Sequence, residues 1–249
     1  MSGSIGAIVH DVDLAAVDDR AWAEIHAAWL RHLVLFFPAQ ELSAGELVAL
    51  GRRLGELDVH PYLPKLDGHD EVVVLDSETG VRADFWHTDV AFSETPPTAS
   101  ILQLVESPPH GGDTMWSNQY LAYEQLSEPM QALLDGLTAV HDAGSHGDAS
   151  AAATHPVVRV HPETGRRSLF VNGTSTSHLV ELRRDESDAL LRMLCEASVR
   201  PEHTCRYRWG RGDVAMWDNR CTQHYAIDDY DGTRIGRRVT VTGERPVGI

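Results

Sequence analysis

The chain has 249 residues, of which 42% are hydrophobic, a length that suits one domain with a substantial core. It carries 21 basic and 37 acidic residues, a formal net charge of −16. Because this charge repels phosphate groups and no basic block offsets it, we expect no binding to nucleic acid or to an anionic membrane surface. Lys65 is the only lysine, which argues against Schiff-base chemistry and a phosphate-binding loop.

The cysteine usage and the start of the chain indicate a reducing compartment. Cys195, Cys205 and Cys221 form no Cys-x-x-Cys pair, so they are interpreted as free thiols rather than a disulfide framework or a zinc ribbon. The first residues lack the pattern of a signal peptide. The longest strongly apolar run, Leu33–Phe37, is far shorter than the ~20 residues of a membrane helix. We therefore expect a cytoplasmic protein that does not bind a membrane.

Four helical segments are predicted in chain order, over 18–32, after Ser43, within 117–137 and over 185–198. Ser43 and Glu46 have the spacing of a capping box, in which the two side chains satisfy each other's free backbone amides. Within 117–137 we expect one or two helices, with Ser127 as N-cap and Pro129 in the first turn.

Ten short segments rich in β-branched and aromatic residues are predicted strands, over 33–37, 71–75, 100–105, 138–142, 156–161, 168–172, 203–209, 213–217, 223–227 and 234–242. They do not alternate with helices, which argues against a doubly wound parallel sheet. The pattern predicts a mainly β fold, a jelly roll with flanking helices. Because no repeat or linker divides the chain, we expect a single domain over 1–249.

The first candidate site lies in the aromatic segment Phe85–Phe92. In an extended chain residues i and i+2 point to the same face, so His87 and Asp89 would project together. An imidazole beside a carboxylate supplies two of the three ligands of a facial triad, the arrangement that holds Fe(II) in non-haem oxygenases. His-x-Asp pairs are common, and the alternative is a structural hydrogen bond between the two side chains.

The second candidate site lies near the C-terminus, where His224 follows a predicted buried strand. Asp231-Gly232 predicts a turn, after which Arg234 and Arg238 share one face of the last strand. We expect a hairpin that sets these arginines beside the strand of His224. Two guanidinium groups next to a metal histidine suit a dianionic ligand. The alternative for this strand alone is a solvated polar face.

Five segments of the chain form a further pattern, in chain order Trp86–Pro97, Gly111–Trp116, His155–Pro162, Leu169–Asn172 and Trp217–Ala226. Together they resemble the taurine dioxygenase-like (TauD/TfdA) family of Fe(II)- and 2-oxoglutarate-dependent dioxygenases. The resemblance runs from about residue 5 to the C-terminus. It implies a double-stranded β-helix, a cupin-like form of the jelly roll, and a homo-oligomer that is a dimer or a tetramer.

The resemblance also implies the roles of individual residues. Three of them match the iron ligands of the family, namely His87, Asp89 and His224. Thr114 and Arg234 match the residues that hold the distal carboxylate of 2-oxoglutarate. Arg238 matches a position that meets either the inner carboxylate of this cosubstrate or the anionic group of the substrate.

The implied reaction uses O2 to decarboxylate 2-oxoglutarate to succinate and CO2 and to hydroxylate an unactivated C–H bond. The intact Asp89 favours hydroxylation, because relatives that halogenate lack this carboxylate. If the hydroxylated carbon bears a heteroatom, the product collapses to an aldehyde and releases sulfite, sulfate or an alcohol.

His60 and the backbone of Val90 match family positions that receive the anionic group of the substrate. The resemblance therefore implies a small sulfonate, alkyl sulfate, or aryloxy or alkyl carboxylate. The alternative for His60 is a turn residue before a proline. Ala83 replaces an asparagine that would orient taurine, and the segment 143–153 is shorter than the usual lid. Both departures predict a more open pocket than that of a taurine enzyme.

Several residues near these motifs are given a structural interpretation. Trp116, Trp217 and Phe92 are expected in the core rather than in the wall of a substrate pocket. Most of the 14 histidines stand in polar stretches and are interpreted as surface or capping residues, among them His10, His69, His146, His155 and His178.

Two functions other than an oxygenase remain open at this point. One is a non-catalytic, cupin-like protein that binds a metal, and the other is an inactive scaffold. The pair Thr114 and Arg234 discriminates between them and the enzyme, because a metal site without turnover has no need of a clamp for a dicarboxylate.

Overall fold

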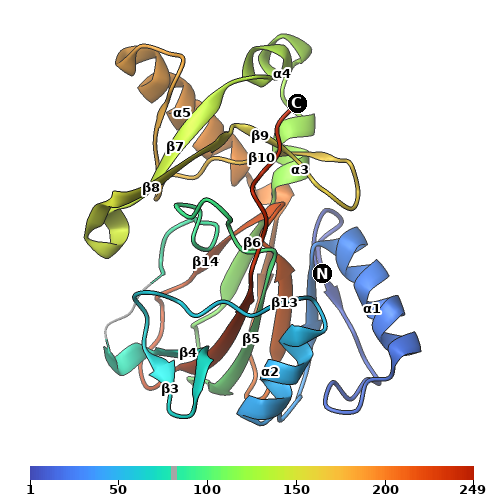
Figure 1. The fold of residues 1–249 in the computed structure, drawn as a ribbon. Coiled ribbons are helices and arrows are strands. Elements are labelled where there is room, and N and C mark those ends of the chain that lie inside the picture. Colours follow the sequence, from blue (N-terminus) through green and yellow to red (C-terminus); the bar gives the residue numbers. More distant parts are fainter. Residues whose placement is uncertain (80–82) are drawn as a thin grey trace.

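The computed structural model describes residues 1–79 and 83–249, and its centre is a seven-stranded sheet (Figure 1). The strands of this sheet, in spatial order, are β1 (Ala7–Ile8), β2 (Val34–Phe37), β13 (Val214–Asp218), β5 (Ala99–Glu106), β15 (Ile235–Val241), β4 (His69–Asp76) and β3 (Lys65–Leu66). All neighbours are antiparallel except β1 and β2. A second sheet, β12 (Thr204–Tyr207), β6 (Thr114–Asn118) and β14 (Thr222–Ala226), packs against it. The two sheets form the predicted jelly roll.

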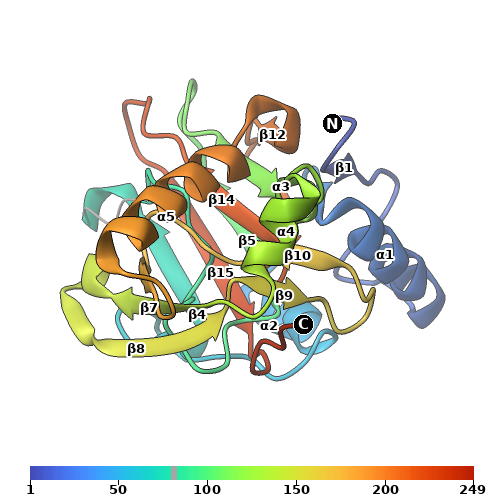
Figure 2. The same ribbon diagram turned by 90° about the horizontal axis from the view of Figure 1, so that it is seen from above.

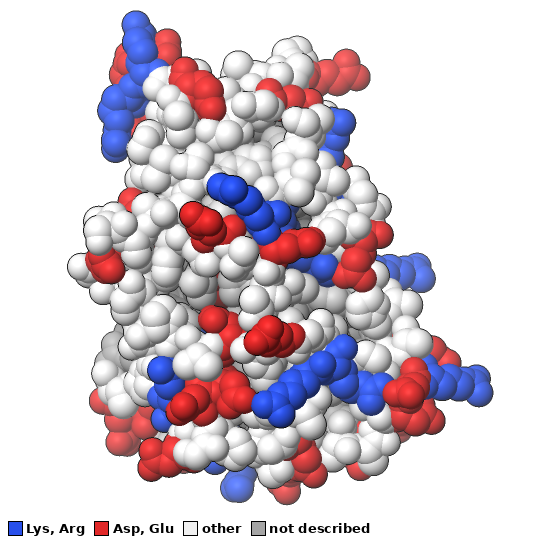
Figure 3. All heavy atoms as spheres, viewed as in Figure 1, with Lys and Arg blue, Asp and Glu red and all other residues white. Residues whose placement is uncertain are grey.

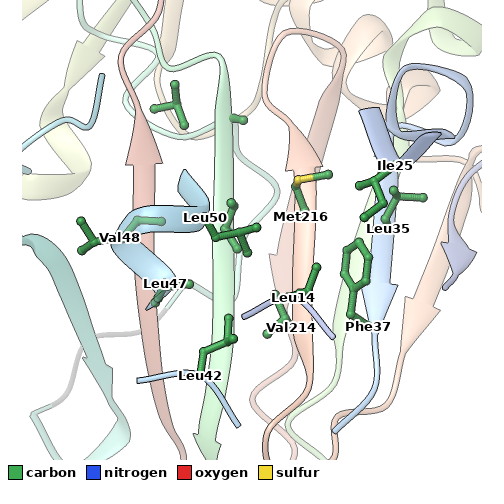
Figure 4. Close-up of a cluster of buried hydrophobic side chains, with 14 of the residues drawn as sticks. Leu14, Ile25, Leu35, Phe37, Leu42, Leu47, Val48, Leu50, Val214 and Met216 are labelled. Atoms are coloured by element: carbon green, nitrogen blue, oxygen red, sulfur yellow. The ribbon is translucent and has the colours of Figure 1, made fainter. Parts of the chain in front are cut away.

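The strands of the large sheet are buried on both faces because two hydrophobic clusters lie on either side of it. In β2, Leu35 and Phe37 belong to one cluster, and Val34 and Phe36 belong to the other. The first cluster is covered by helices α1 (Asp19–His32) and α2 (Ala44–Arg52). Figure 4 shows side chains of α2 reaching towards the strands of the sheet. The second cluster fills the space between the two sheets.

A third group of elements lies at the upper end of the jelly roll in Figure 1 and in front of the sheets in Figure 2. It contains a three-stranded sheet of β11 (Thr176–Leu179), β7 (Thr138–Ala143) and β8 (Asp148–Pro156) and the pair β9 (Val158–Val160) and β10 (Arg167–Leu169). Its helices are α3 (Gln119–Glu124), α4 (Glu128–Leu134) and α5 (Arg184–Ser198). Short 3-10 turns occur at η1 (Ser77–Thr79), η2 (Gly144–His146) and η3 (Pro201–His203). A third hydrophobic cluster joins these elements.

The predicted helix starts agree closely with the structure. The capping box before α2 is present, since the Ser43 amide donates to Glu46 at 2.7 Å and the Glu46 amide donates to Ser43 Oγ at 3.3 Å. Ser127 is the N-cap of α4 with proline in the first turn, although its side chain makes no capping hydrogen bond.

Five strands of the structure were not predicted, namely the two-residue strands β1 and β3, and β6, β11 and most of β8. The segment 143–153, predicted as a lid loop, consists of η2 and the first half of β8. Residues 148–153 are mostly alanine and serine, which have low strand propensity, and they are extended because they pair with β7. Tertiary pairing overrides local preference here.

The predicted hairpin between the strand of His224 and the last strand is wrong. β14 lies in the three-stranded sheet, whereas β15 lies inside the large sheet between β5 and β4. The connection 227–234 therefore carries the chain from one sheet to the other. The predicted alternation of β15 is confirmed, since Val239 and Val241 join the cluster under the helices while Arg238 lies on the opposite face, towards the second sheet.

The surface charge on the face shown in Figure 3 is mixed in sign, with basic and acidic side chains next to one another. Ion pairs with exposed side chains include Arg52 with Glu71 at 2.8 Å and Arg53 with Asp19 at 2.7 Å. Within residues 1–79 and 83–249, none of the helices has the length and apolar character needed to cross a membrane.

Candidate active site

A cavity that is partly open to solvent lies between the two sheets. One sheet contributes side chains from β6 and β14, and the large sheet contributes side chains from four of its strands. The strand residues that line it are Thr114, Trp116, His224, Ala226, Leu75, Leu102, Trp217 and Arg238. Loops close its outer end. All eight positions predicted from the sequence for metal, cosubstrate or substrate border this one cavity.

His87, Asp89 and His224 converge as predicted, with their ligand atoms within 4.8 Å of one another. Asp89 Oδ1 lies 4.0 Å from His87 Nε2 and 3.8 Å from His224 Nε2. The two histidines are joined through their backbones, since the amide of each donates to the carbonyl of the other, at 3.1 and 2.8 Å. This backbone pairing holds the segment that carries His87 against β14. The alternative of a direct His–Asp hydrogen bond does not fit these distances.

The protonation of the three side chains suits a divalent metal ion. The Nδ1 of His87 lies 2.9 Å from the Phe85 carbonyl, to which it donates, so Nε2 is left unprotonated and faces Asp89. Burial lowers the pKa of His87 and of His224, which keeps both imidazoles neutral. Burial alone would raise the pKa of the Asp89 carboxyl, but Arg238 and the two histidines hold it below its ordinary value. Two neutral imidazoles and one carboxylate form the facial set that binds Fe(II).

Arg238 lies against the carboxylate of this triad. Its Nη1 is 2.6 Å from Asp89 Oδ1, and both side chains are buried. The solvated polar face considered for its strand is therefore wrong for this residue. The structure brings Arg238 to the centre of the cavity, where its charge is next to the metal ligands.

Thr114 and Arg234 also come together as predicted. Arg234 Nη2 lies 3.5 Å from Thr114 Oγ1, and Arg234 Nε donates to the Gly112 carbonyl at 3.0 Å. The indole of Trp209 donates to Thr114 Oγ1 at 2.9 Å and lies 5.9 Å from the Arg234 guanidinium. A buried guanidinium beside a hydroxyl forms a site for a carboxylate, because it offers several donors in a fixed geometry.

The glycine pair before Thr114 shapes the backbone beside this site. Gly111 and Gly112 both have positive φ, at +72° and +70°, a region that favours glycine. A Cβ on Gly111 would lie 2.4 Å from the carbonyl oxygen of Asp229, and Gly112 donates its amide to the Asp229 side chain at 2.9 Å. The two glycines therefore permit the close approach that places the Gly112 carbonyl against Arg234.

His60 and Val90 lie at the outer part of the cavity. The Nδ1 of His60 accepts from the amides of Tyr62 and Leu63, both at 3.2 Å, so the proton of the neutral ring is on Nε2. Burial, with a smaller effect of Arg238, lowers the pKa of His60 to about 4. His60 is thus both a turn residue and part of the cavity wall. Val90 has φ of +45°, a strained backbone for a β-branched residue, directly after Asp89.

Comparison with known proteins decides the family. Residues 1–240 match the model of the taurine catabolism dioxygenase TauD, TfdA family. An α-ketoglutarate-dependent sulfate ester dioxygenase of Pseudomonas putida is 42% identical over 100% of this chain and 90% of its own length. An alkylsulfatase of Acinetobacter baylyi is 39% identical over 100% of this chain and 85% of its own. The crystal structure of a taurine dioxygenase from Burkholderia xenovorans superimposes with a TM-score of 0.91, at 43% identity, over 99% and 90% of the two chains.

The chain belongs to the TauD/TfdA family. It is an α-ketoglutarate-dependent dioxygenase, so the predicted family, fold and enzyme class are confirmed. The relatives favour the enzyme over the two non-catalytic alternatives that the sequence left open.

Three rings that the motifs did not indicate form the rim of this TauD/TfdA dioxygenase, where His146 and Phe92 line the cavity and Tyr62 packs on them from outside. His146 of η2 stacks on Tyr62, with ring centroids 5.4 Å apart and planes 16° from parallel. Phe92 lies 5.7 Å from His146 and 6.2 Å from Tyr62. The Tyr62 hydroxyl donates to Asp148 at 3.0 Å, which ties its loop to β8. The sequence predicted His146 at the surface and Phe92 in the core, but both side chains also line the cavity.

Three other interpretations also change. Trp116 and Trp217 are buried as expected, yet both line the cavity, and the Trp217 ring is 4.9 Å from that of His224. His155, expected at the surface, is buried in β8 with its Nε2 2.8 Å from the Ser93 carbonyl. Each of these side chains lies in a strand that is buried because a segment distant in the sequence packs on it.

A second group of ligand-type residues in the described part of the chain, His161, Asp218 and Cys221, is an ion-pair network. Asp218 accepts from His161 Nε2 at 3.0 Å, and its two oxygens accept from Arg220 at 2.9 and 2.7 Å. Burial raises the pKa of the Cys221 thiol well above its ordinary value, so the sulfur stays protonated. The carboxylate is neutralised by arginine, and Cys221 packs in the core as predicted.

Proposed function

We propose that this dioxygenase holds Fe(II) on His87, Asp89 and His224, uses O2, and hydroxylates a small organic anion, with sulfate esters as the first substrate class. The observation that carries the proposal is the convergence of the triad with two buried arginines, Arg234 and Arg238, in one cavity. A cavity built only to bind a metal has no use for two further cationic groups.

The iron role rests on the chemistry of the donor set. The triad presents two neutral imidazoles and a carboxylate on one side of the cavity and leaves the other side free. Bound Fe(II) would supply the activation of O2, coupled to decarboxylation of 2-oxoglutarate to succinate and CO2. Trp217 packs against His224 and helps to keep water from the ligand side of the site.

The cosubstrate role rests on Thr114 and Arg234. Their donors lie together at the end of the cavity formed by β6 and the start of β15. We assign the distal carboxylate of 2-oxoglutarate to this pair, with the keto acid end towards the triad. Because the guanidinium is buried, its attraction for a carboxylate is weakly screened by water.

The substrate role rests on Arg238, His60 and Val90. Arg238 supplies positive charge, and neutral His60 has its Nε2 proton available as a donor towards the cavity. We assign the anionic group of the substrate to this end, with the Val90 amide as a further donor. The two relatives at 42% and 39% identity, a sulfate ester dioxygenase and an alkylsulfatase, favour a sulfate ester over a sulfonate or a carboxylate.

The reaction balances for a primary alkyl sulfate, R-CH2-O-SO3⁻. One oxygen atom of O2 enters the C–H bond of the carbon next to the ester oxygen, and the other enters succinate as 2-oxoglutarate loses CO2. The hydroxylated carbon then expels hydrogen sulfate and becomes an aldehyde. The protein's part is to place that carbon beside the triad by holding the sulfate at a fixed distance from it.

The test starts with an anaerobic titration of metal-free protein with Fe(II) and 2-oxoglutarate. We expect the visible charge-transfer band of the chelate, followed by release of succinate, hexanal and sulfate when hexyl sulfate and air are added. Hexanesulfonate and phenoxyacetate serve as the alternative anions. Iron binding without the band would overturn the cosubstrate assignment, and turnover of only the sulfonate or only the carboxylate would overturn the substrate class.

We also propose a single domain that assembles into a dimer or tetramer in the cytoplasm. The support is the resemblance to the family together with three thiols that form no disulfide in the structure. Light scattering of the purified protein tests the assembly.

A further inference from the structure

A chain of buried hydrogen bonds ends on the second oxygen of the Asp89 carboxylate. Ser100 Oγ donates to Asp89 Oδ2 at 2.7 Å. Asn219 Nδ2 donates to Ser100 Oγ at 2.9 Å, and Trp217 Nε1 donates to Asn219 Oδ1 at 3.0 Å. All four side chains are at most 4% exposed. Oδ2 is therefore turned away from the triad, and Oδ1 is the oxygen that faces the two imidazoles.

The donors of this chain are fixed by the backbone as well. Ser100 lies in β5, which is paired on both sides, opposite Trp217 of β13 and Thr240 of β15. The Asn219 amide donates to the Thr98 carbonyl at 3.0 Å. Neither Ser100 nor Asn219 can move far without breaking the large sheet. The direction of the Asp89 carboxylate is thus set by the sheet rather than by the turn that contains Asp89.

The same chain is linked to the other side of the triad. The Trp217 ring packs against the His224 ring, with centroids 4.9 Å apart. One tryptophan therefore contacts a histidine of the triad directly and reaches Asp89 through three hydrogen bonds. Partners of this kind orient metal ligands and tune their affinity.

We propose that Ser100 is a positioning residue that keeps Asp89 a one-oxygen ligand and so preserves the coordination position that 2-oxoglutarate needs. This inference rests on the proposed function. A facial triad leaves three positions of an octahedral ion free, two for the keto acid and one for O2. A carboxylate that binds through both oxygens would occupy one of these. By engaging Oδ2, the Ser100 hydroxyl prevents that second contact.

The test compares Ser100→Ala with a matched control. Ser117→Ala removes a second buried serine hydroxyl, one on β6 that donates to the Ser198 carbonyl and does not line the cavity. Two quantities are measured anaerobically for each protein. One is the affinity for Fe(II) by competition with a chelator, and the other is the 2-oxoglutarate concentration that gives half of the charge-transfer absorption.

For Ser100→Ala we expect Fe(II) affinity equal to or above that of the unmodified protein, together with roughly a tenfold higher 2-oxoglutarate midpoint, the lower end of typical effects at such positions. Ser117→Ala should change neither. An unchanged midpoint in Ser100→Ala would overturn the inference, and so would a parallel loss of both affinities, which indicates general loosening. If the unmodified protein binds Fe(II) without the band, the proposed function itself fails and the inference falls with it.

A second variant keeps the inference testable if Ser100→Ala does not fold. Asn219→Ala leaves the serine in place but removes the donor that orients its hydroxyl. We expect the 2-oxoglutarate midpoint to rise while the Fe(II) affinity stays unchanged, and this rise should be smaller than in Ser100→Ala. If Asn219→Ala changes only the Fe(II) affinity, the hydrogen-bond chain holds Asp89 as a ligand but does not keep the coordination position for 2-oxoglutarate free. The inference would then be wrong.

Discussion

The inner half and the rim of the cavity are built in different ways. The inner half consists of side chains from the strands of two sheets and from the segments next to them, and several of its polar groups have fixed partners, as Arg234 has in Gly112 and Thr114. The rim consists of rings from three separate loops that touch mainly one another. Trp217 in the inner half is 1% exposed, whereas Tyr62 on the rim is 42% exposed.

This difference separates the chemistry of the enzyme from its choice of substrate. Thr114 and His224 lie in paired strands, and the backbone of His87 and the side chain of Asp89 are bonded to strand residues, so the sites proposed for iron and 2-oxoglutarate are anchored to the sheets. Groups on loops are free to vary without disturbing these sheets. We therefore expect substitutions in the inner half to affect turnover of every substrate and substitutions on the rim to affect substrates selectively.

The largest effect is expected for His224→Ala, which removes one metal ligand. Iron content should fall to background, and succinate release should be lost for hexyl sulfate and every other substrate. His178→Ala, on β11 outside the cavity, is the control and should retain both. Normal iron content in His224→Ala would remove His224 from the triad.

Arg234→Ala should raise the 2-oxoglutarate requirement by about 100-fold, because truncating one partner of a buried charge pair costs about 2–5 kcal/mol. Turnover at saturating 2-oxoglutarate should be largely retained, since the triad is intact. Arg237→Ala, on the other face of the same strand, is the control. If the two variants change the KM for 2-oxoglutarate equally, the assignment of Arg234 is wrong.

A smaller and selective effect is expected on the rim. Tyr62→Ala should raise the KM for hexyl sulfate roughly fivefold, the loss of about 1 kcal/mol of ring contact, and leave the KM for 2-oxoglutarate unchanged. Tyr62→Phe keeps the ring and loses only the bond to Asp148, so it separates stacking from the tie to β8. An equal rise of the KM for hexyl sulfate and of the KM for 2-oxoglutarate in Tyr62→Ala would contradict the division between rim and inner half.

The smallest effect concerns the stability of the metal-free protein at low pH. Burial lowers the pKa of His141 to about 3 and that of His60 to about 4, from an ordinary value of 6.5. The unfolded chain binds more protons between these values, so stability is lost as the pH falls through this window. We expect the Tm to drop by roughly 5 °C between pH 7 and pH 5. His141→Gln should flatten this dependence and the exposed His10→Gln should not.

The parts of the site that share a local motif could be predicted from the sequence, and the rest could not. His87 and Asp89 are two residues apart, and Arg234 and Arg238 share a strand face, so their relation follows from local geometry. Ser100 contacts Asp89 only because β5 passes beneath that turn, and nothing near Ser100 in the sequence marks it.

The fold shows the same division. Strands with strong local preference were predicted, whereas β8 is extended because β7 pairs with it. The hairpin between β14 and β15 was expected because a turn separates them, but the chain crosses between sheets there. Pairing partners that are distant in sequence carry no local signal. The rim is a further case, since Tyr62 and His146 meet only after folding.

The position of β15 also constrains how the protein is made. This strand is the last one in chain order and lies inside the large sheet, where both β5 and β4 pair with it. During translation the edges of β4 and β5 that pair with β15 stay open until β15 has left the ribosome. Since unpaired strand edges promote aggregation, the nascent chain is exposed to it until this strand is in place. The two arginines of the cavity join the iron ligands only when β15 enters the sheet.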